Sequence, residues 1–214
     1  MAELTVRRFD GRDMPRCTQI AIDAWENVEE EHVDSGAWET YLRHFLAKSN
    51  WAEVVCDSDL VVGLLFGRID IKGRERPFKK EGASVFRLTR EILLGEFELS
   101  HGIIPVLWTF VMTELKLKLN MPRSDSEIIM FVLDENYRGM GVGRLMVDRF
   151  AKAARDSGAL LMTVYTEDQI SNWQFYEKYG FKKVGSFYND LDSYFIGRKS
   201  TAMIYALDLD SSKK

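Results

Sequence analysis

The chain has 214 residues, 46% hydrophobic and 29% charged, a balance typical of one folded domain and unlike that of disordered proteins. Its formal net charge of -4 argues against broad electrostatic binding to nucleic acid or to an anionic membrane, because both need a dense basic surface. The amino terminus is polar and has no apolar stretch suited to a signal peptide or a membrane helix, so a cytoplasmic protein is predicted.

The first part of the chain predicts a strand, two helices and a hairpin. Residues 4–9 read as the strand, and Asp13 is predicted to cap the first helix. The two helices are predicted from apolar side chains at helical spacing, namely Cys17, Ile20, Ala21, Ala24 and Trp25, then Trp38, Tyr41, Leu42 and Phe45. Two apolar runs, 51–56 and 60–69, flank the turn residues 57–59 and are predicted to form an antiparallel hairpin.

Residues 71–126 form a segment of different character. It opens with a highly charged stretch, and helices are predicted over Val85–Leu94 and Ile103–Leu117. The apolar stretch 102–111 is too short to span a bilayer, so it is predicted to be buried in the domain or in a homodimer contact.

The second half begins with a continuous apolar run, 128–133, typical of a central strand that is covered on both faces. A glycine-rich turn follows, then an amphipathic helix that ends at Ser157-Gly158, and then a strand over 160–166. This order predicts a βαβ unit with parallel strands and a right-handed crossover. The predicted elements are completed by a short helix over 171–179 and a terminal pair of strands, 181–188 and 202–209.

The glycine-rich turn Arg138-Gly139-Met140-Gly141-Val142-Gly143 stands immediately before the predicted helix. A helix start carries unpaired N–H groups and a partial positive charge, so it binds an anion wherever the preceding loop allows close approach. The three glycines allow that approach, and Arg138 and Arg144 add positive charge. Taken alone, the pattern fits a phosphate site and a simple packing turn about equally well.

Two other nucleotide motifs do not fit this turn. A P-loop needs Lys followed by Ser or Thr after the glycines, and Arg144-Leu145 stands there instead. A dinucleotide fingerprint needs Gly-x-Gly-x-x-Gly near the first strand, whereas the last glycine spacing here is too short and the turn comes after several strands.

The turn resembles the GNAT acetyltransferase motif Arg/Gln-x-x-Gly-x-Gly/Ala, which Arg138, Gly141 and Gly143 match at each defined position. A second signature of that family, Phe-Tyr-Glu-Lys-x-Gly-Phe, is matched by residues 175–181 at the family's spacing. The stretch 127–181 is therefore similar to the acetyl-CoA-binding core of the family. The resemblance implies an α/β acyl-CoA N-acyltransferase fold with a mixed, mostly antiparallel sheet, helices on both faces and a helical insertion.

The resemblance also implies roles for particular residues. Tyr176 stands where the family has a tyrosine that protonates the departing thiolate, and a phenol with a pKa of about 10 is protonated at neutral pH. Glu127 begins the central strand, where a family base often stands, and it is interpreted either as the general base or as a solvated strand end. In the family the two central strands diverge here and leave the thioester between them.

The implied cofactor contacts are mainly backbone groups that would hold the pyrophosphate and pair with the pantetheine arm. The predicted contact residues are Phe131, Leu133, Arg138, Gly139, Met140, Gly141, Val142, Gly143, Arg144 and Asn172. Asn172 belongs to a stretch that departs from the family's usual residues, so it either contacts the cofactor or caps the short helix. The three histidines are scattered, and no metal site is predicted.

The resemblance implies one N-acetyltransferase domain over residues 1–214, with an insertion over 71–126 and the acetyl-CoA-binding core over 127–181. The implied reaction moves an acetyl group from acetyl-CoA to a primary amine on a small molecule or a peptide, by direct attack. Two alternatives stay open, namely transfer of a longer acyl group and a non-catalytic acyl-CoA sensor. The insertion is interpreted as a cover for the acceptor site, a structural addition or a dimer contact.

Overall fold

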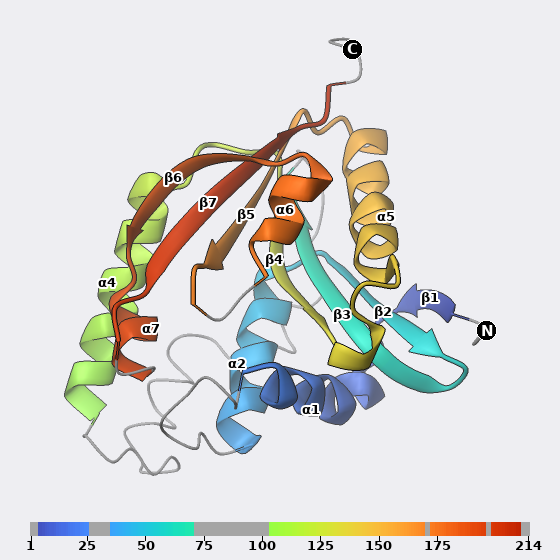
Figure 1. Cartoon of the computed structure of the whole chain (residues 1–214), viewed down its shortest axis with the longest axis horizontal. Helices are drawn as coiled ribbons and strands as arrows, with labels where there is room; N and C mark the ends of the chain where they lie inside the picture. Colours follow the sequence, from blue (N-terminus) through green and yellow to red (C-terminus); the bar gives the residue numbers. More distant parts are fainter. Residues whose placement is uncertain (1–3, 26–34, 71–102, 170–171, 196–197, 211–214) are drawn as a thin grey trace.

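The computed structural model describes residues 4–25, 35–70, 103–169, 172–195 and 198–210 (Figure 1). Its centre is a seven-stranded sheet with the order β1-β2-β3-β4-β5-β7-β6. The strands are β1 Leu4–Arg8, β2 Trp51–Asp57, β3 Leu60–Ile69, β4 Ser126–Leu133, β5 Leu161–Glu167, β6 Lys182–Tyr188 and β7 Thr201–Asp208. The α-helices are α1 Met14–Trp25, α2 Ser35–Lys48, α4 Ile103–Asn120, α5 Val142–Asp156, α6 Gln174–Tyr179 and α7 Asp190–Phe195.

The strand pairing confirms the predicted mixed sheet. β4 and β5 are parallel, and every other neighbouring pair is antiparallel. The parallel pair is joined through α5, as predicted for the βαβ unit. The terminal strands do pair, but β7 lies between β5 and β6, an order that local sequence patterns do not encode.

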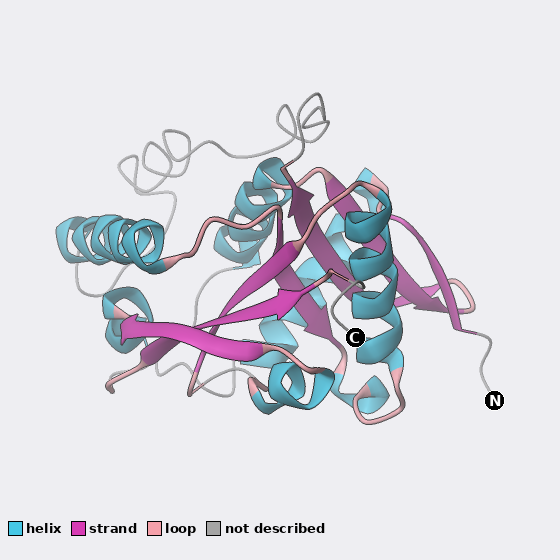
Figure 2. Cartoon of the chain, turned by 90° about the horizontal axis from the view of Figure 1, so that it is seen from above, coloured by secondary structure: helices cyan, strands magenta, loops and turns pink. Residues whose placement is uncertain are grey.

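Helices cover both faces of the sheet, as Figure 2 shows, and two apolar cores result. On one face α5 packs through side chains that recur every three or four residues, including Met146, Phe150 and Ala154, and α6 adds Tyr176. On the other face α1 and α2 pack against the sheet through residues such as Ile20 and Leu42. These two surfaces are called the α5 face and the α2 face below.

One extra residue in β4 divides the side chains of that strand between the two faces. Gly67 pairs with Ile128 and Phe66 pairs with Met130, so Ile129 is a β-bulge. Ile128 belongs to the core of the α5 face, whereas Met130 belongs to the core of the α2 face. Side chains two apart on a regular strand share a face, so the bulge shifts the alternation of β4 by one residue.

The two parallel strands separate directly beyond this bulge. β4 pairs with β5 only from Ser126 to Ile128, although β4 continues to Leu133. The closed end is held by side chains: Ser124 Oγ lies 2.8 Å from Thr163 Oγ1, and the Ser126 hydroxyl donates to the Leu161 carbonyl at 3.2 Å. In Figure 1, β4 and β5 run apart below the level of α6. The divergence that the family resemblance implies is therefore present.

Helix α4, from the segment predicted to be an insertion, bridges elements of the two halves of the sheet. Lys48 of α2 lies 3.0 Å from Glu114 of α4. The Thr113 hydroxyl donates to Asn189 Oδ1 at 3.2 Å, and Lys116 forms an ion pair with Asp190. α4 is thus tied to α2 on one side of the gap and to the β6–α7 region on the other. No described helix is both long and apolar enough to cross a membrane.

Three sequence predictions need correction or restriction. Asp10, not Asp13, caps the first helical turn, because its side chain accepts from the Arg12 N–H while Asp13 accepts from the Asp10 N–H as the other half of a capping box. In the stretch predicted to be buried, Trp108 is 66% exposed and Val111 is 55% exposed, so burial in the domain is wrong for both. The predicted helix over 85–94 lies outside the described residues.

Candidate active site

The turn before α5 has positive φ angles at two of its glycines. Gly139 has a φ of +76° and Gly141 has a φ of +82°, in the left-handed region that side chains other than glycine rarely adopt. A Cβ atom at either position would meet nothing within 4 Å. These two glycines are therefore required by the course of the backbone and leave the space around the turn open.

The start of α5 is not capped by a side chain. Gly141 is the N-cap residue, and no side-chain hydrogen bond caps the helix there. The first intrahelical bond runs from the Leu145 N–H to the Gly141 carbonyl at 3.0 Å. The N–H groups that precede Leu145 in this first turn have no carbonyl one turn earlier in the helix to bind, and they lie at the positive end of the helix dipole. This helix start has the chemistry of an anion site.

Gly143 has a different function from the other two glycines in the turn. A Cβ atom at Gly143 would lie 3.3 Å from Phe175 and 3.4 Å from both Leu133 and Phe131. Glycine therefore allows the first turn of α5 to pack closely against the end of β4 and the start of α6. This contact places the anion site at the open end of the gap between β4 and β5.

The edge of β4 that faces this gap presents backbone groups. The Asp134 N–H donates to the Val62 carbonyl of β3 at 2.9 Å. Because backbone groups of successive residues in a strand point in opposite directions, those of Phe131 and Leu133 point away from β3 and toward the gap. An extended ligand can pair with this edge as an added strand would.

The remaining predicted cofactor residues lie around the same turn. The Arg138 guanidinium donates to the Leu133 carbonyl at 3.3 Å, and that of Arg144 lies 5.4 Å from the centre of the Tyr179 ring. Met140 is 65% exposed. Asn172 has an exposed side chain before α6, and its carbonyl accepts from the Phe175 N–H at 3.0 Å. No side-chain bond caps α6, so the predicted cap by Asn172 is made only through its backbone.

Tyr176 is buried on the α5 face. Its ring packs against those of Phe175, Phe181 and Tyr205, with centroids 5.4, 5.6 and 6.3 Å away. Burial, with a smaller contribution from the charge of Glu167, raises the pKa of the Tyr176 hydroxyl. The hydroxyl is protonated at neutral pH, and within the described ranges no residue hydrogen-bonds to it. The environment therefore fits both a packed aromatic residue and a proton donor.

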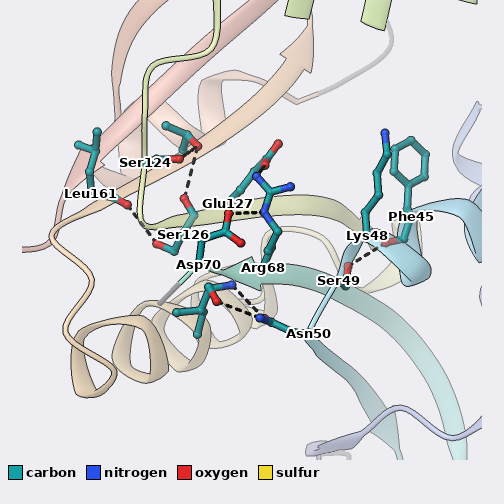
Figure 3. Close-up of polar contacts among 12 residues, drawn as sticks. Phe45, Lys48, Ser49, Asn50, Arg68, Asp70, Ser124, Ser126, Glu127 and Leu161 are labelled. Carbon is teal, nitrogen blue, oxygen red and sulfur yellow. Dashed lines mark hydrogen bonds and ion pairs between the residues drawn. The ribbon is translucent and has the colours of Figure 1, made fainter. Parts of the chain in front are cut away.

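Glu127 lies on the opposite face of the sheet. It pairs across the β3–β4 ladder with Arg68, and Arg68 Nη2 lies 2.7 Å from Glu127 Oε2 (Figure 3). The Glu127 side chain is 15% exposed, which makes a solvated strand end a poor description of it. Burial raises the pKa of its carboxyl group, and the neighbouring charge of Arg68 opposes that rise.

The charged residues around Glu127 are the part of the site that sequence reasoning missed. Arg68 and Asp70 stand at the end of an apolar strand, and Lys48 and Glu114 end or interrupt predicted helices. A charge that interrupts an apolar strand is the one signal that could have drawn attention to Arg68. The described residues contain no group of three or more His, Cys, Asp or Glu side chains arranged to hold a metal ion.

Comparison with known proteins gives a match of sequence over the core and a match of fold over the whole chain. Residues 110–181 match the family model described as "Acetyltransferase (GNAT) family". No curated protein sequence matches the chain significantly.

The structural matches cover nearly the whole chain at low sequence identity. The C-terminal condensation domain of Ebony, in complex with beta-alanyl-dopamine, has a TM-score of 0.63 at 11% identity, over 97% of this chain and 100% of that chain. An aminoglycoside 6'-N-acetyltransferase in complex with coenzyme A has a TM-score of 0.57 at 13% identity, over 96% and 97%. The ribosomal-protein-S18-alanine N-acetyltransferase from Escherichia coli has a TM-score of 0.55 at 12% identity, over 97% and 95%.

At these identities the structural likeness is one of fold, and the sequence match is confined to residues 110–181. That matched segment contains the turn before α5, the open edge of β4 and Tyr176, so the fold and the motifs coincide at one place. Residues 110–181 thus match the GNAT acetyltransferase family in sequence, and the whole chain shares its fold with N-acetyltransferases of known structure.

Proposed function

We propose that this protein transfers an acetyl group from acetyl-CoA to a primary amine. The observation that carries the proposal is the uncapped start of α5 at the mouth of the gap between β4 and β5. A helix start suits a pyrophosphate, and an open strand edge suits the amide groups of a pantetheine arm. The two features lie next to each other because Gly143 packs against Phe131 and Leu133.

The residues present fit acetyl-CoA as the co-substrate. The N–H groups from Gly139 to Arg144 surround open space, where a Cβ atom at Gly139 or Gly141 would meet no neighbour. These groups hold the pyrophosphate in our proposal, and the backbone of Phe131 and Leu133 pairs with the arm. Acetyl-CoA supplies the acetyl thioester. The coenzyme A complex of the structurally similar aminoglycoside acetyltransferase supports this choice.

Glu127 and Tyr176 provide proton transfer from the two faces of the sheet. Glu127 accepts a proton from the acceptor amine as that amine attacks, and Glu127 Oε1 is the available atom because Oε2 binds Arg68. Tyr176 donates its hydroxyl proton to the sulfur as the bond to the acetyl group breaks. The raised pKa of each group suits its role, since burial makes Glu127 a stronger base and keeps Tyr176 protonated.

The acceptor is a primary amine of a small molecule or a peptide, and it approaches from the α2 face, where Glu127 lies. Helix α4 lies beside this approach, because it contacts α2 through Glu114 and the α7 region through Thr113. We therefore propose that the inserted segment contributes to acceptor choice.

A screen of amines tests the proposed function directly. The protein is mixed with acetyl-CoA and each amine, and release of the coenzyme A thiol is followed together with the mass of the acetylated product. Isothermal titration with acetyl-CoA is run in parallel. Amine-dependent thiol release supports acetyl transfer. Absence of acetyl-CoA binding contradicts the proposal, and binding without turnover on any amine identifies an acyl-CoA sensor instead. Substituting longer acyl-CoA donors in the same assay determines the acyl group.

A further inference from the structure

Four charged side chains, Lys48, Arg68, Asp70 and Glu114, surround Glu127 on the α2 face. Figure 3 shows Lys48, Arg68 and Asp70 together with Glu127. Arg68 lies at their centre. Its Nη2 atom is 2.7 Å from Glu127 Oε2, and its Nε atom is 2.6 Å from Asp70 Oδ2. One guanidinium therefore contacts two carboxylates, through a hydrogen bond to Glu127 and an ion pair with Asp70 that does not have hydrogen-bond geometry.

The pairing of the strands orients these contacts. Arg68 and Glu127 are direct partners in the β3–β4 ladder, so their side chains leave the sheet side by side on one face. Asp70 follows β3, and its N–H donates to the Asp125 carbonyl at 2.7 Å, which fixes its backbone beside the start of β4. Glu127 lies one residue before Ile128, the last position at which β4 pairs with β5, so the Arg68–Glu127 contact is next to the gap.

The outer part of the cluster links α2 to α4. Lys48 and Glu114 form an ion pair of 3.0 Å, and both charges act on Glu127. The positive charges of Arg68 and Lys48 favour the ionised carboxylate, whereas burial and the negative charges of Asp70 and Glu114 favour the protonated form. Burial is the largest of these effects and raises the pKa of Glu127.

The two carboxylate oxygens of Glu127 differ in their partners. Arg68 binds Oε2, and among the described residues none forms a hydrogen bond or an ion pair with Oε1. A carboxylate held at one oxygen has a defined orientation, which a catalytic base needs, because a small misplacement lowers the rate strongly.

We propose that Arg68, itself oriented by Asp70, is a positioning residue that holds the Glu127 carboxylate beside the gap with Oε1 directed to the acceptor amine. This inference rests on the proposed function. A purely structural alternative is that Arg68 only neutralises a buried charge. The two differ in what happens to proton transfer when the cluster is changed without loss of the fold.

The test is the pH dependence of kcat/KM for acetylation of an amine that the wild-type protein accepts. In the wild type, kcat/KM falls as the pH drops through the pKa of Glu127, because only the ionised carboxylate accepts a proton. This decrease of kcat/KM at low pH is the acid limb of the profile. A Glu127→Gln variant must lose the acid limb if the limb reports Glu127. A limb that persists in the variant would instead report protonation of the amine. Carbon-13 NMR titration of the glutamate carboxyls reads the same pKa without turnover.

Substitutions that remove opposite charges are expected to move the limb in opposite directions. Arg68→Gln removes a positive charge, so the pKa of Glu127 and the acid limb rise, by roughly one pH unit. Asp70→Asn removes a negative charge, so the limb moves to lower pH. The positioning role predicts, in addition, a kcat about tenfold lower in Arg68→Gln even on the plateau above the limb. Arg68→Lys keeps the positive charge, so its acid limb should lie at the wild-type pH. Its plateau kcat should stay reduced, because one ammonium group cannot contact both carboxylates as the guanidinium does.

The matched control is Arg149→Gln. Arg149 binds Glu53 through two hydrogen bonds of 2.9 Å between α5 and β2, so it is another arginine paired with a buried glutamate. Its loss lowers stability and leaves the acid limb and the plateau kcat unchanged. If Arg68→Gln does not fold, Arg68→Lys and Asp70→Asn carry the test.

The outcomes separate the inference from the proposed function. Unchanged limbs in the Arg68 and Asp70 variants, shifts in the same direction, or a normal plateau kcat in both Arg68 variants would overturn the positioning role. A wild-type protein that acetylates no amine overturns the proposed function, and the NMR titration then still reports whether Arg68 and Asp70 set the pKa of Glu127.

Discussion

The turn before α5 and the charge cluster around Glu127 are built in opposite ways. The turn consists of consecutive residues, 138–144, and presents backbone N–H groups with open space around Gly139 and Gly141. The cluster consists of charged side chains from α2, β4, α4 and the end of β3, and it forms only because those elements meet. A site of the first kind can be recognised in a sequence, and a site of the second kind only in a fold.

In our proposal the two regions bind different substrates, the turn the acetyl donor and the cluster the acceptor amine. In our proposal the turn binds a part of acetyl-CoA that every acetyltransferase of this kind shares, so a short pattern suffices. In the same proposal the cluster faces the acceptor, and one of its members, Glu114, comes from the segment predicted to be an insertion. The two regions therefore predict different responses to substitution: turn variants should change donor affinity, and cluster variants should change the rate of transfer.

The largest expected effect comes from Glu127→Gln, which tests whether the cluster acts on the rate alone. The amide cannot accept a proton from the amine, so kcat/KM should fall by at least about 100-fold at neutral pH. The dissociation constant for acetyl-CoA, measured by titration calorimetry, should stay within about twofold of the wild type. Glu53→Gln, which changes another buried glutamate, is the control and should retain the rate. A loss of acetyl-CoA affinity as large as the loss of rate would contradict the proposal that the turn sets donor affinity and the cluster sets the rate.

Gly141→Glu tests the other region, the turn before α5. The substitution forces a side chain onto a backbone with a φ of +82° and adds negative charge at the helix start. Acetyl-CoA affinity should fall about 50-fold, the combined effect of backbone strain and lost charge attraction. Gly141→Ala introduces the strain without the charge and should lose at most about tenfold. Equal losses in the two variants would mean that strain, and not the pyrophosphate charge, is responsible.

Tyr176→Phe tests a residue of the matched segment 110–181 to which we assign proton donation in the proposed reaction. Removing the hydroxyl should slow acetyl transfer about tenfold, because the departing sulfur then takes its proton from water. The ring contacts remain, so the melting temperature and the affinity for acetyl-CoA should be nearly unchanged. The measurement is single-turnover formation of the acetylated amine. An unaltered rate would assign Tyr176 to packing.

Thr113→Val gives the smallest expected effect and asks how far the acceptor side depends on α4. The Thr113 hydroxyl donates to Asn189 Oδ1 and accepts from the Leu191 N–H, both at 3.2 Å. Losing it should lower the free energy of unfolding by about 1 kcal/mol, measured by urea denaturation. KM for the amine should rise severalfold while the affinity for acetyl-CoA holds. A change in donor affinity without one in KM for the amine would contradict a role of α4 at the acceptor.

The sequence was sufficient for most elements and for the glycine-rich turn before α5 because the signals are local. Apolar spacing identified α1, α2 and α5, and the turn residues 57–59 identified the β2–β3 hairpin, all of which the structure confirms. The order of β6 and β7 and the contacts of Glu127 could not be predicted, because both depend on pairing between distant segments. The sequence predicts Asp13 as the helix cap, whereas Asp10 caps the turn and Asp13, three residues later, completes the same capping box.

The bulge at Ile129 also bears on how this strand tolerates change in length. A deletion of this one residue would restore a regular period-two strand, because Ile128 and Met130 would become consecutive and would keep the opposite faces that they occupy now. Glu127 would stay on the α2 face, and Met130 and Val132 would stay in the core that they share with α1 and α2. A residue inserted into a regular part of β4 would instead reverse the faces of all residues on one side of it, so deletion of Ile129 should be far less damaging than such an insertion.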